Sequence, residues 1–158
     1  ASYRYPDSAT VYPNVTWAPA TFVVGAGPET VGTVEGVTTI TADFTAATLT
    51  LVLDTVLTSP TWNAAAFNGV MFSAAVPHGI ASVSIDPATT MAGLDASRVS
   101  LGSDEIRIDW NGLGYVDGTR VVVAFTFPAT PVPEPAALAL LGAGLAGLGF
   151  AGRRARPA

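Results

Sequence analysis

The sequence predicts an all-β fold: an antiparallel β-sandwich with an extended arm before it and one transmembrane helix after it. Short runs of β-branched and apolar residues recur along the chain, separated by turns rich in Pro, Gly, Asn and Asp. Prolines interrupt the start of the chain, and its last part contains a long uncharged stretch. We therefore expect an extended arm at 1–19, a sandwich at 20–130 and a tail at 131–158.

The segment 1–19 carries Pro6, Pro13 and Pro19 among several aromatic residues. Proline and the residue before it favour extended backbone over helix. An extended segment cannot bury its aromatic rings against itself, so it packs either on its own sandwich or on a partner. We expect it to serve as a docking arm for a partner, through four aromatic side chains: Tyr3, Tyr5, Tyr12 and Trp17.

Six segments of the central part have the composition or the period-2 alternation of β-strands. These are 37–44, 48–53, 69–73, 80–85, 105–110 and 120–127. In the last of them, Val121, Val123 and Phe125 should share one face, with Val122, Ala124 and Thr126 on the other. The intervening turns suit an antiparallel sandwich.

The stretch 136–152 contains no charged or strongly polar side chain. As a helix it would be about 25 Å long, close to the thickness of a bilayer core. Arg153 and Arg154 follow it, and cationic flanks favour the cytoplasmic side. We therefore expect a single-pass protein of the bacterial inner membrane with residues 1–135 in the periplasm. The chain begins at Ala1 and not at Met, so we expect its signal peptide to have been removed already.

Composition and charge exclude several function classes. Residues 1–135 hold four arginines and no lysine against twelve acidic residues, a net charge of −8 that disfavours nucleic acid as a partner. Cysteine is absent, so no disulfide supports the fold. His78 is the only histidine, and neither a Ser-His triad nor a tetrahedral zinc site can be assembled plausibly around it. We expect no enzyme activity, no cofactor and no metal.

Two alternatives for ligand binding stay open at this point. Six acidic residues crowd one third of the chain, where they either hold calcium or are solvated turn residues. Trp62 and Trp110 either pack in the core or stack on glycans. The six acidic residues are Asp86, Asp95, Asp104, Glu105, Asp109 and Asp117.

The tail resembles a known sorting signal. The uncharged stretch is preceded by Val132, Pro133, Glu134 and Pro135 and is followed by Arg153 and Arg154. This order of motif, apolar helix and basic end resembles the PEP-CTERM signal of Gram-negative bacteria. The resemblance implies export, a stay in the inner membrane and recognition by an exosortase near the Pro-Glu-Pro motif. Residues 83–127 also resemble the β domain that often precedes such a tail, which implies a fold and no activity.

Small residues recur at four-residue spacing within the expected helix, and such a ridge lets another helix approach closely. They are Ala139, Ala143, Gly147 and Ala151. The alternative is that this type of tail is simply rich in Ala and Gly.

The arm, the sandwich and the tail together predict a non-catalytic, membrane-anchored periplasmic subunit that docks on a larger membrane complex. A photosynthetic reaction-centre and antenna complex or a respiratory complex would be a suitable host. Its partners would be the subunits of that complex, the lipid bilayer and an exosortase. The alternative is an exosortase-processed protein of the surface or extracellular matrix that binds glycans.

Overall fold

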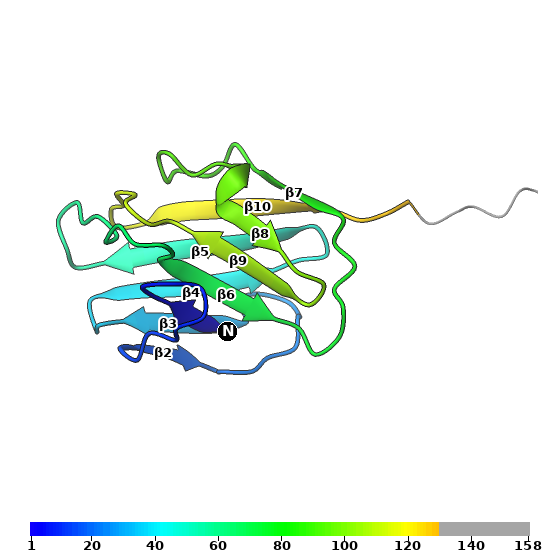
Figure 1. Ribbon diagram of the computed structural model, residues 1–158, viewed down its shortest axis with the longest axis horizontal. Coiled ribbons are helices and arrows are strands. Elements are labelled where there is room, and N and C mark those ends of the chain that lie inside the picture. Colours follow the sequence, from blue (N-terminus) through cyan, green and yellow to red (C-terminus); the bar gives the residue numbers. More distant parts are fainter. Residues whose placement is uncertain (130–158) are drawn as a thin grey trace, which may run out of the picture. The chain divides into compact units, whose positions relative to one another are not determined.

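Two antiparallel sheets face each other in the computed structural model, which describes residues 1–129 (Figure 1). The four-stranded sheet has the order β1 (Ser2–Arg4), β6 (Gly69–Ser73), β9 (Glu105–Asp109) and β8 (Val99–Leu101). The six-stranded sheet has the order β2 (Val15–Ala18), β3 (Thr30–Val34), β4 (Thr38–Phe44), β5 (Thr48–Thr55), β10 (Thr119–Thr126) and β7 (Ser82–Ile85). One 3₁₀ turn, η1 (Ala96–Arg98), precedes β8. The predicted all-β antiparallel sandwich is confirmed.

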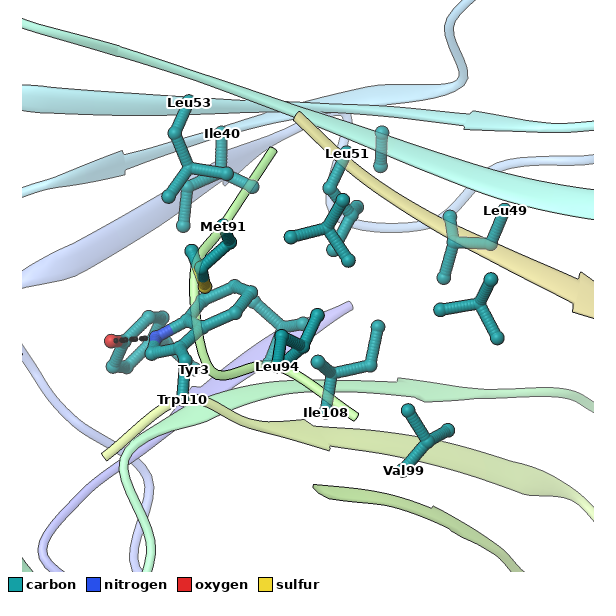
Figure 2. Packing of buried hydrophobic residues seen from close by; sticks show 14 of the residues in the cluster. Tyr3, Ile40, Leu49, Leu51, Leu53, Met91, Leu94, Val99, Ile108 and Trp110 are labelled. Carbon is teal, nitrogen blue, oxygen red and sulfur yellow. Dashed lines mark hydrogen bonds between the residues drawn. The ribbon is translucent and has the colours of Figure 1, made fainter. Parts of the chain in front are cut away.

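The core lies between the sheets, where the alternate side chains of each strand meet. β5 contributes Leu49, Leu51 and Leu53, and the opposite sheet contributes Ile108 and Val70; all five are fully buried. Figure 2 shows several of these residues with Met91 and Leu94, which come from the segment before η1. This period-2 burial follows from the strand pattern, because successive side chains point to opposite faces.

β10 has the predicted alternation. Val121 and Val123 are fully buried in the core, and Phe125 packs against its edge. Val122 faces the other way, and it is buried outside the core cluster. Its backbone N–H donates to the Thr89 hydroxyl at 2.9 Å.

All six predicted strands are present as β4, β5, β6, β7, β9 and β10, with ends shifted by at most two residues. β1, β2, β3 and β8 were not predicted.

The first nineteen residues are not a separate arm. β1 pairs with β6 and β2 pairs with β3, so the segment adds an edge strand to each sheet. Tyr3 is only 2% exposed and belongs to the core. Ala1–Pro128 form one compact unit, without the boundary expected at residue 19. The prolines stand outside the strands, where a missing N–H breaks no ladder. Of the two alternatives for the aromatic rings, the structure shows packing on the sandwich.

The tail predictions fall outside the described residues. They comprise the transmembrane helix at 136–152, the sorting motif, the basic end and the small-residue ridge. Within residues 1–129, no helix has the length and apolar character needed to cross a membrane.

Candidate functional site

An apolar groove opens at the end of the sandwich where β4, β6 and β10 finish. Its volume is about 510 Å³. Phe44, Phe72 and Phe125 line it from these strands, and Ile106 lines it from the start of β9. Phe44 and Phe72 meet edge to face, with ring centroids 5.1 Å apart. Aromatic side chains from both sheets therefore line the groove.

The rim of the groove consists of loops with exposed apolar side chains. Val23 is 90% exposed, Val76 is 68% exposed and Phe127 is 46% exposed, and Val24 lies beside Val23. Sequence reasoning missed these residues, because Val23, Val24 and Val76 lie outside the predicted strands and Phe127 is the last residue of one. The available signal was the absence of charge from the loops 20–28, 45–47, 74–81 and 127–129.

Two polar side chains hold the rim loops in place. The Glu29 carboxylate is buried and accepts hydrogen bonds from the backbone N–H groups of Gly25, at 2.9 Å, and Phe44, at 2.6 Å. It therefore ties the loop that carries Val23 to the end of β4. His78 Nδ1 accepts from the Ile80 N–H at 3.0 Å, and its Nε2 lies 3.4 Å from the Glu105 carbonyl oxygen. Both ring nitrogens are therefore engaged with backbone groups, as is typical of a structural histidine and not of a general base.

An aromatic cluster occupies the opposite end of the core. Trp62 stacks on Tyr115 with centroids 4.5 Å apart and on Trp110 with centroids 5.5 Å apart. The Tyr3 hydroxyl accepts a hydrogen bond from Trp110 Nε1 at 2.8 Å and donates to Asn68 Oδ1 at 2.7 Å. Burial raises the pKa of Tyr3 far above its ordinary value. This hydroxyl is a fixed structural link.

Trp62 and Trp110 are 7% and 0% exposed. Neither offers a ring face to a glycan, so of the two alternatives the structure shows core packing.

A small pocket of about 180 Å³ adjoins this cluster. Tyr5 and Tyr12 meet edge to face at its mouth, with centroids 5.5 Å apart, and both are half-buried. The Tyr12 hydroxyl is hydrogen-bonded to the Glu35 carboxylate, which raises the pKa of Tyr12. Three of the four residues expected in a docking arm, Tyr3 among them, therefore gather at this end.

Trp17, the fourth residue of the expected arm, lies elsewhere. Its ring packs against Phe72, with centroids 5.8 Å apart, and covers Gly32. The four aromatic residues therefore do not form one surface.

Four of the six acidic residues considered as calcium ligands accept hydrogen bonds from backbone N–H groups. Asp86 accepts from the Ala88 N–H at 2.8 Å, Asp95 from the Ser97 N–H at 2.8 Å, and Asp117 from the Thr55 N–H at 2.9 Å. Asp109 accepts from the backbone N–H groups of Asn68 and Asn111. In the described part of the chain, no three His, Cys, Asp or Glu side chains come together as a metal site would require.

The comparison with protein families finds a match in the part of the chain that follows β10. Residues 131–155 match the family model for the PEP-CTERM protein-sorting motif. The chain carries a PEP-CTERM sorting signal. The match begins five residues after Thr126, the last residue of β10, and it includes Val132, Pro133, Glu134 and Pro135. It confirms the resemblance seen in the sequence.

The PEP-CTERM match also spans Arg153, Arg154 and the small-residue ridge. No curated protein and no solved structure matched the chain.

Proposed function

We propose that this protein is an exported surface or extracellular protein, held in the inner membrane by its tail and processed there by an exosortase. The observation that carries the proposal is the PEP-CTERM motif at 131–155, directly behind the last strand of the sandwich. The motif supports a route to the surface, and the sandwich is then the part that is delivered.

The position of the motif suits removal of the tail. The compact unit ends at Pro128, and the Pro-Glu-Pro motif lies at 133–135. A cut beside this motif leaves all ten strands, together with every contact described above, in the released product.

The proposed exported protein takes the place of the expected subunit of a photosynthetic or respiratory complex. That expectation depended in part on an aromatic docking arm, and Tyr3 of that arm is a core residue. A sorting signal also requires only a processing enzyme and gives no reason for a permanent host complex. The comparisons lend no support to a reaction-centre subunit.

The test is the intact mass of the protein recovered from the membrane, the cell surface and the medium of a host that contains the exosortase. We expect the surface and medium fractions to lack the residues beyond about Pro135. Pro133→Ala and Pro135→Ala should leave the full tail on, as should deletion of the exosortase gene. Pro128→Ala, outside the matched residues, is the control and should be processed normally. A mass that includes Ala158 in every fraction would contradict the proposal.

A second candidate function is binding of a glycan ring at the pocket beside Tyr5 and Tyr12. It is favoured by two half-exposed aromatic rings next to the Glu35 carboxylate, a hydrogen-bond acceptor. Titration with oligosaccharides, followed by the NMR signals of these tyrosines, tests it. Binding should be weakened by Tyr12→Ala. Shifts that are equally large around Val23, at the other end of the sandwich, would argue against a specific site.

A further inference from the structure

We propose that the groove end of the sandwich rests on the phospholipid bilayer while the tail is in the membrane, with the rim side chains in the interfacial region of the lipid. This inference rests on the proposed function, because it needs the tail to be held in the bilayer. It adds a second membrane contact, made by the folded domain itself.

The rim of the groove is apolar. Val23 and Val24 from one loop, Val76 from a second and Phe127 from a third surround one hollow, and all four are exposed. Soluble domains rarely gather exposed apolar side chains in this way unless the patch is a contact surface. A hollow of about 510 Å³ behind them gives lipid chains or interfacial groups room to enter between the sheets.

Charged side chains are distributed unequally between the two ends of the sandwich. The loops 20–28, 45–47, 74–81 and 127–129 contain no Asp, Glu, Lys or Arg. Asp104, in the turn between β8 and β9, is the only carboxylate among the residues that line the groove, and Glu105 beside it is paired with Arg107. The opposite end carries Glu35, Asp54 and Asp117 in or beside its loops. Acidic side chains lose hydration when they approach a bilayer, and anionic lipids repel them. Contact with the membrane through the groove end therefore costs less free energy than contact through the opposite end.

The chain continues toward the sorting motif from the groove end of the sandwich. Phe127 lines the groove and is followed closely by the matched motif at 131. Only nine residue steps separate Phe127 from Ala136, where the uncharged stretch begins. Fully extended, they span at most about 30 Å. A tail in the bilayer thus keeps the rim within reach of the lipid surface.

The tether allows a weak contact to be effective. When the tail holds the domain near the surface, contact between rim and lipid becomes intramolecular and benefits from a high effective concentration. Stable membrane attachment commonly combines two such signals, neither of which is sufficient alone. Removal of the tail would leave only the rim, and the domain would then leave the surface.

The experiment uses the full chain, which has no cysteine of its own, in phosphatidylcholine–phosphatidylglycerol nanodiscs. Single cysteines introduced as Val23→Cys, Val76→Cys and Val56→Cys are labelled with an environment-sensitive fluorophore. Val56 is the matched control: it is an exposed valine, 82% accessible, in a loop at the opposite end of the sandwich. Quenching is measured with lipids that carry a nitroxide on the headgroup.

We expect headgroup nitroxides to quench the labels at positions 23 and 76 at least threefold more than the label at 56, with blue-shifted emission at 23 and 76. Equal quenching at all three positions would overturn the proposal. A blue shift at 23 and 76 without quenching would also overturn it, because protein would then cover the rim, either the tail of the same chain or a second copy.

A fourth label, introduced as Ala146→Cys, separates this proposal from the proposed function. Quenching of this label by nitroxides placed deep in the acyl chains reports that the tail is in the bilayer. If the tail is quenched and the rim is not, only the membrane contact of the sandwich is wrong. If the tail is not quenched either, the proposed membrane-held stage fails as well.

Discussion

Trp110 donates a hydrogen bond from its indole Nε1 to the hydroxyl of Tyr3 at 2.8 Å, deep in the core (Figure 2). The Tyr3 hydroxyl in turn donates a hydrogen bond to Asn68 Oδ1, and the Asn68 side-chain amide donates to the Asn63 carbonyl oxygen at 2.9 Å. The residue pair joins β1, near the start of the chain, to the end of β9. Because each polar atom named has a partner, the chain of bonds can be buried without the cost of an unpaired group.

Tyr3→Phe should lower the free energy of unfolding by about 1–3 kcal/mol. The substitution leaves the Trp110 indole N–H and the Asn68 oxygen buried and without their shared partner. Chemical denaturation followed by fluorescence measures the loss. Tyr5→Phe is the control, because Tyr5 is only half-buried, and it should change stability by less than about 0.5 kcal/mol. Equal effects of the two substitutions would show that the buried hydroxyl contributes nothing.

Deletion of residues 1–19 should abolish cooperative folding of the sandwich. It removes an edge strand from each sheet and takes Tyr3 out of the core. Near-ultraviolet circular dichroism and thermal unfolding measure the outcome. Truncation after Pro128, where the compact unit ends, is the control and should leave the unfolding midpoint in place. A folded deletion variant with an unchanged midpoint would mean that the first two strands are dispensable.

Gly69→Ala should be strongly destabilising, by about 1–3 kcal/mol or more. A Cβ atom at Gly69 would lie 1.9 Å from the Ile108 carbonyl oxygen, so β6 and β9 would have to separate. Gly25→Ala is the matched control, because the nearest atom to its Cβ is 3.9 Å away. That substitution should be neutral or stabilise by about 0.4–1 kcal/mol through the unfolded state. Urea denaturation of both variants checks the prediction, and similar midpoints would refute it.

Acid should weaken the fold in part through Asp95, which caps η1. Hydrogen bonds from the Ser97 side chain and backbone N–H hold the pKa of Asp95 below its ordinary value of 3.8. Asp95 therefore binds its proton more tightly in the unfolded chain than in the folded one. The stability contributed by Asp95 is complete above pH 3.8 and is lost as the pH falls through the lowered folded pKa.

Asp95→Asn keeps a capping oxygen but cannot titrate, so the variant should lose less stability between pH 5 and pH 2 than the parent chain. Denaturation curves at a series of pH values measure the difference, and carboxyl NMR gives the pKa directly. Identical pH profiles would mean that Asp95 is not linked to folding.

The strands that the sequence predicted are those with a clear local signal. β5 and β10 are eight residues long and rich in Val, Leu and Thr, so their pattern is visible without tertiary information. β1 and β8 are three residues long, which is too short for any period to be recognised. β3 is interrupted by Gly32, whose missing side chain makes room for the Trp17 ring from the neighbouring strand. Only the partner strand explains that glycine.

The groove could not be predicted for a related reason. Val23, Val76 and Phe127 lie far apart in the sequence, and each stands in a loop or just after a strand end. Their common location depends on which strand ends meet at the same edge of the sandwich, which is a property of the topology. The sorting motif, in contrast, is formed by consecutive residues, so it could be recognised without knowledge of the fold.

The bond between Tyr3 and Trp110 also sets an order of events during biogenesis. Among the described strands β1 is the earliest in the sequence, and its ladder partner β6 begins at Gly69. The indole that completes the link arrives only with residue 110. The buried link of Tyr3 can therefore be completed only after about a hundred further residues have been made, and pairing at such sequence separation is slow. The sandwich closes late, once most of residues 1–129 have been made.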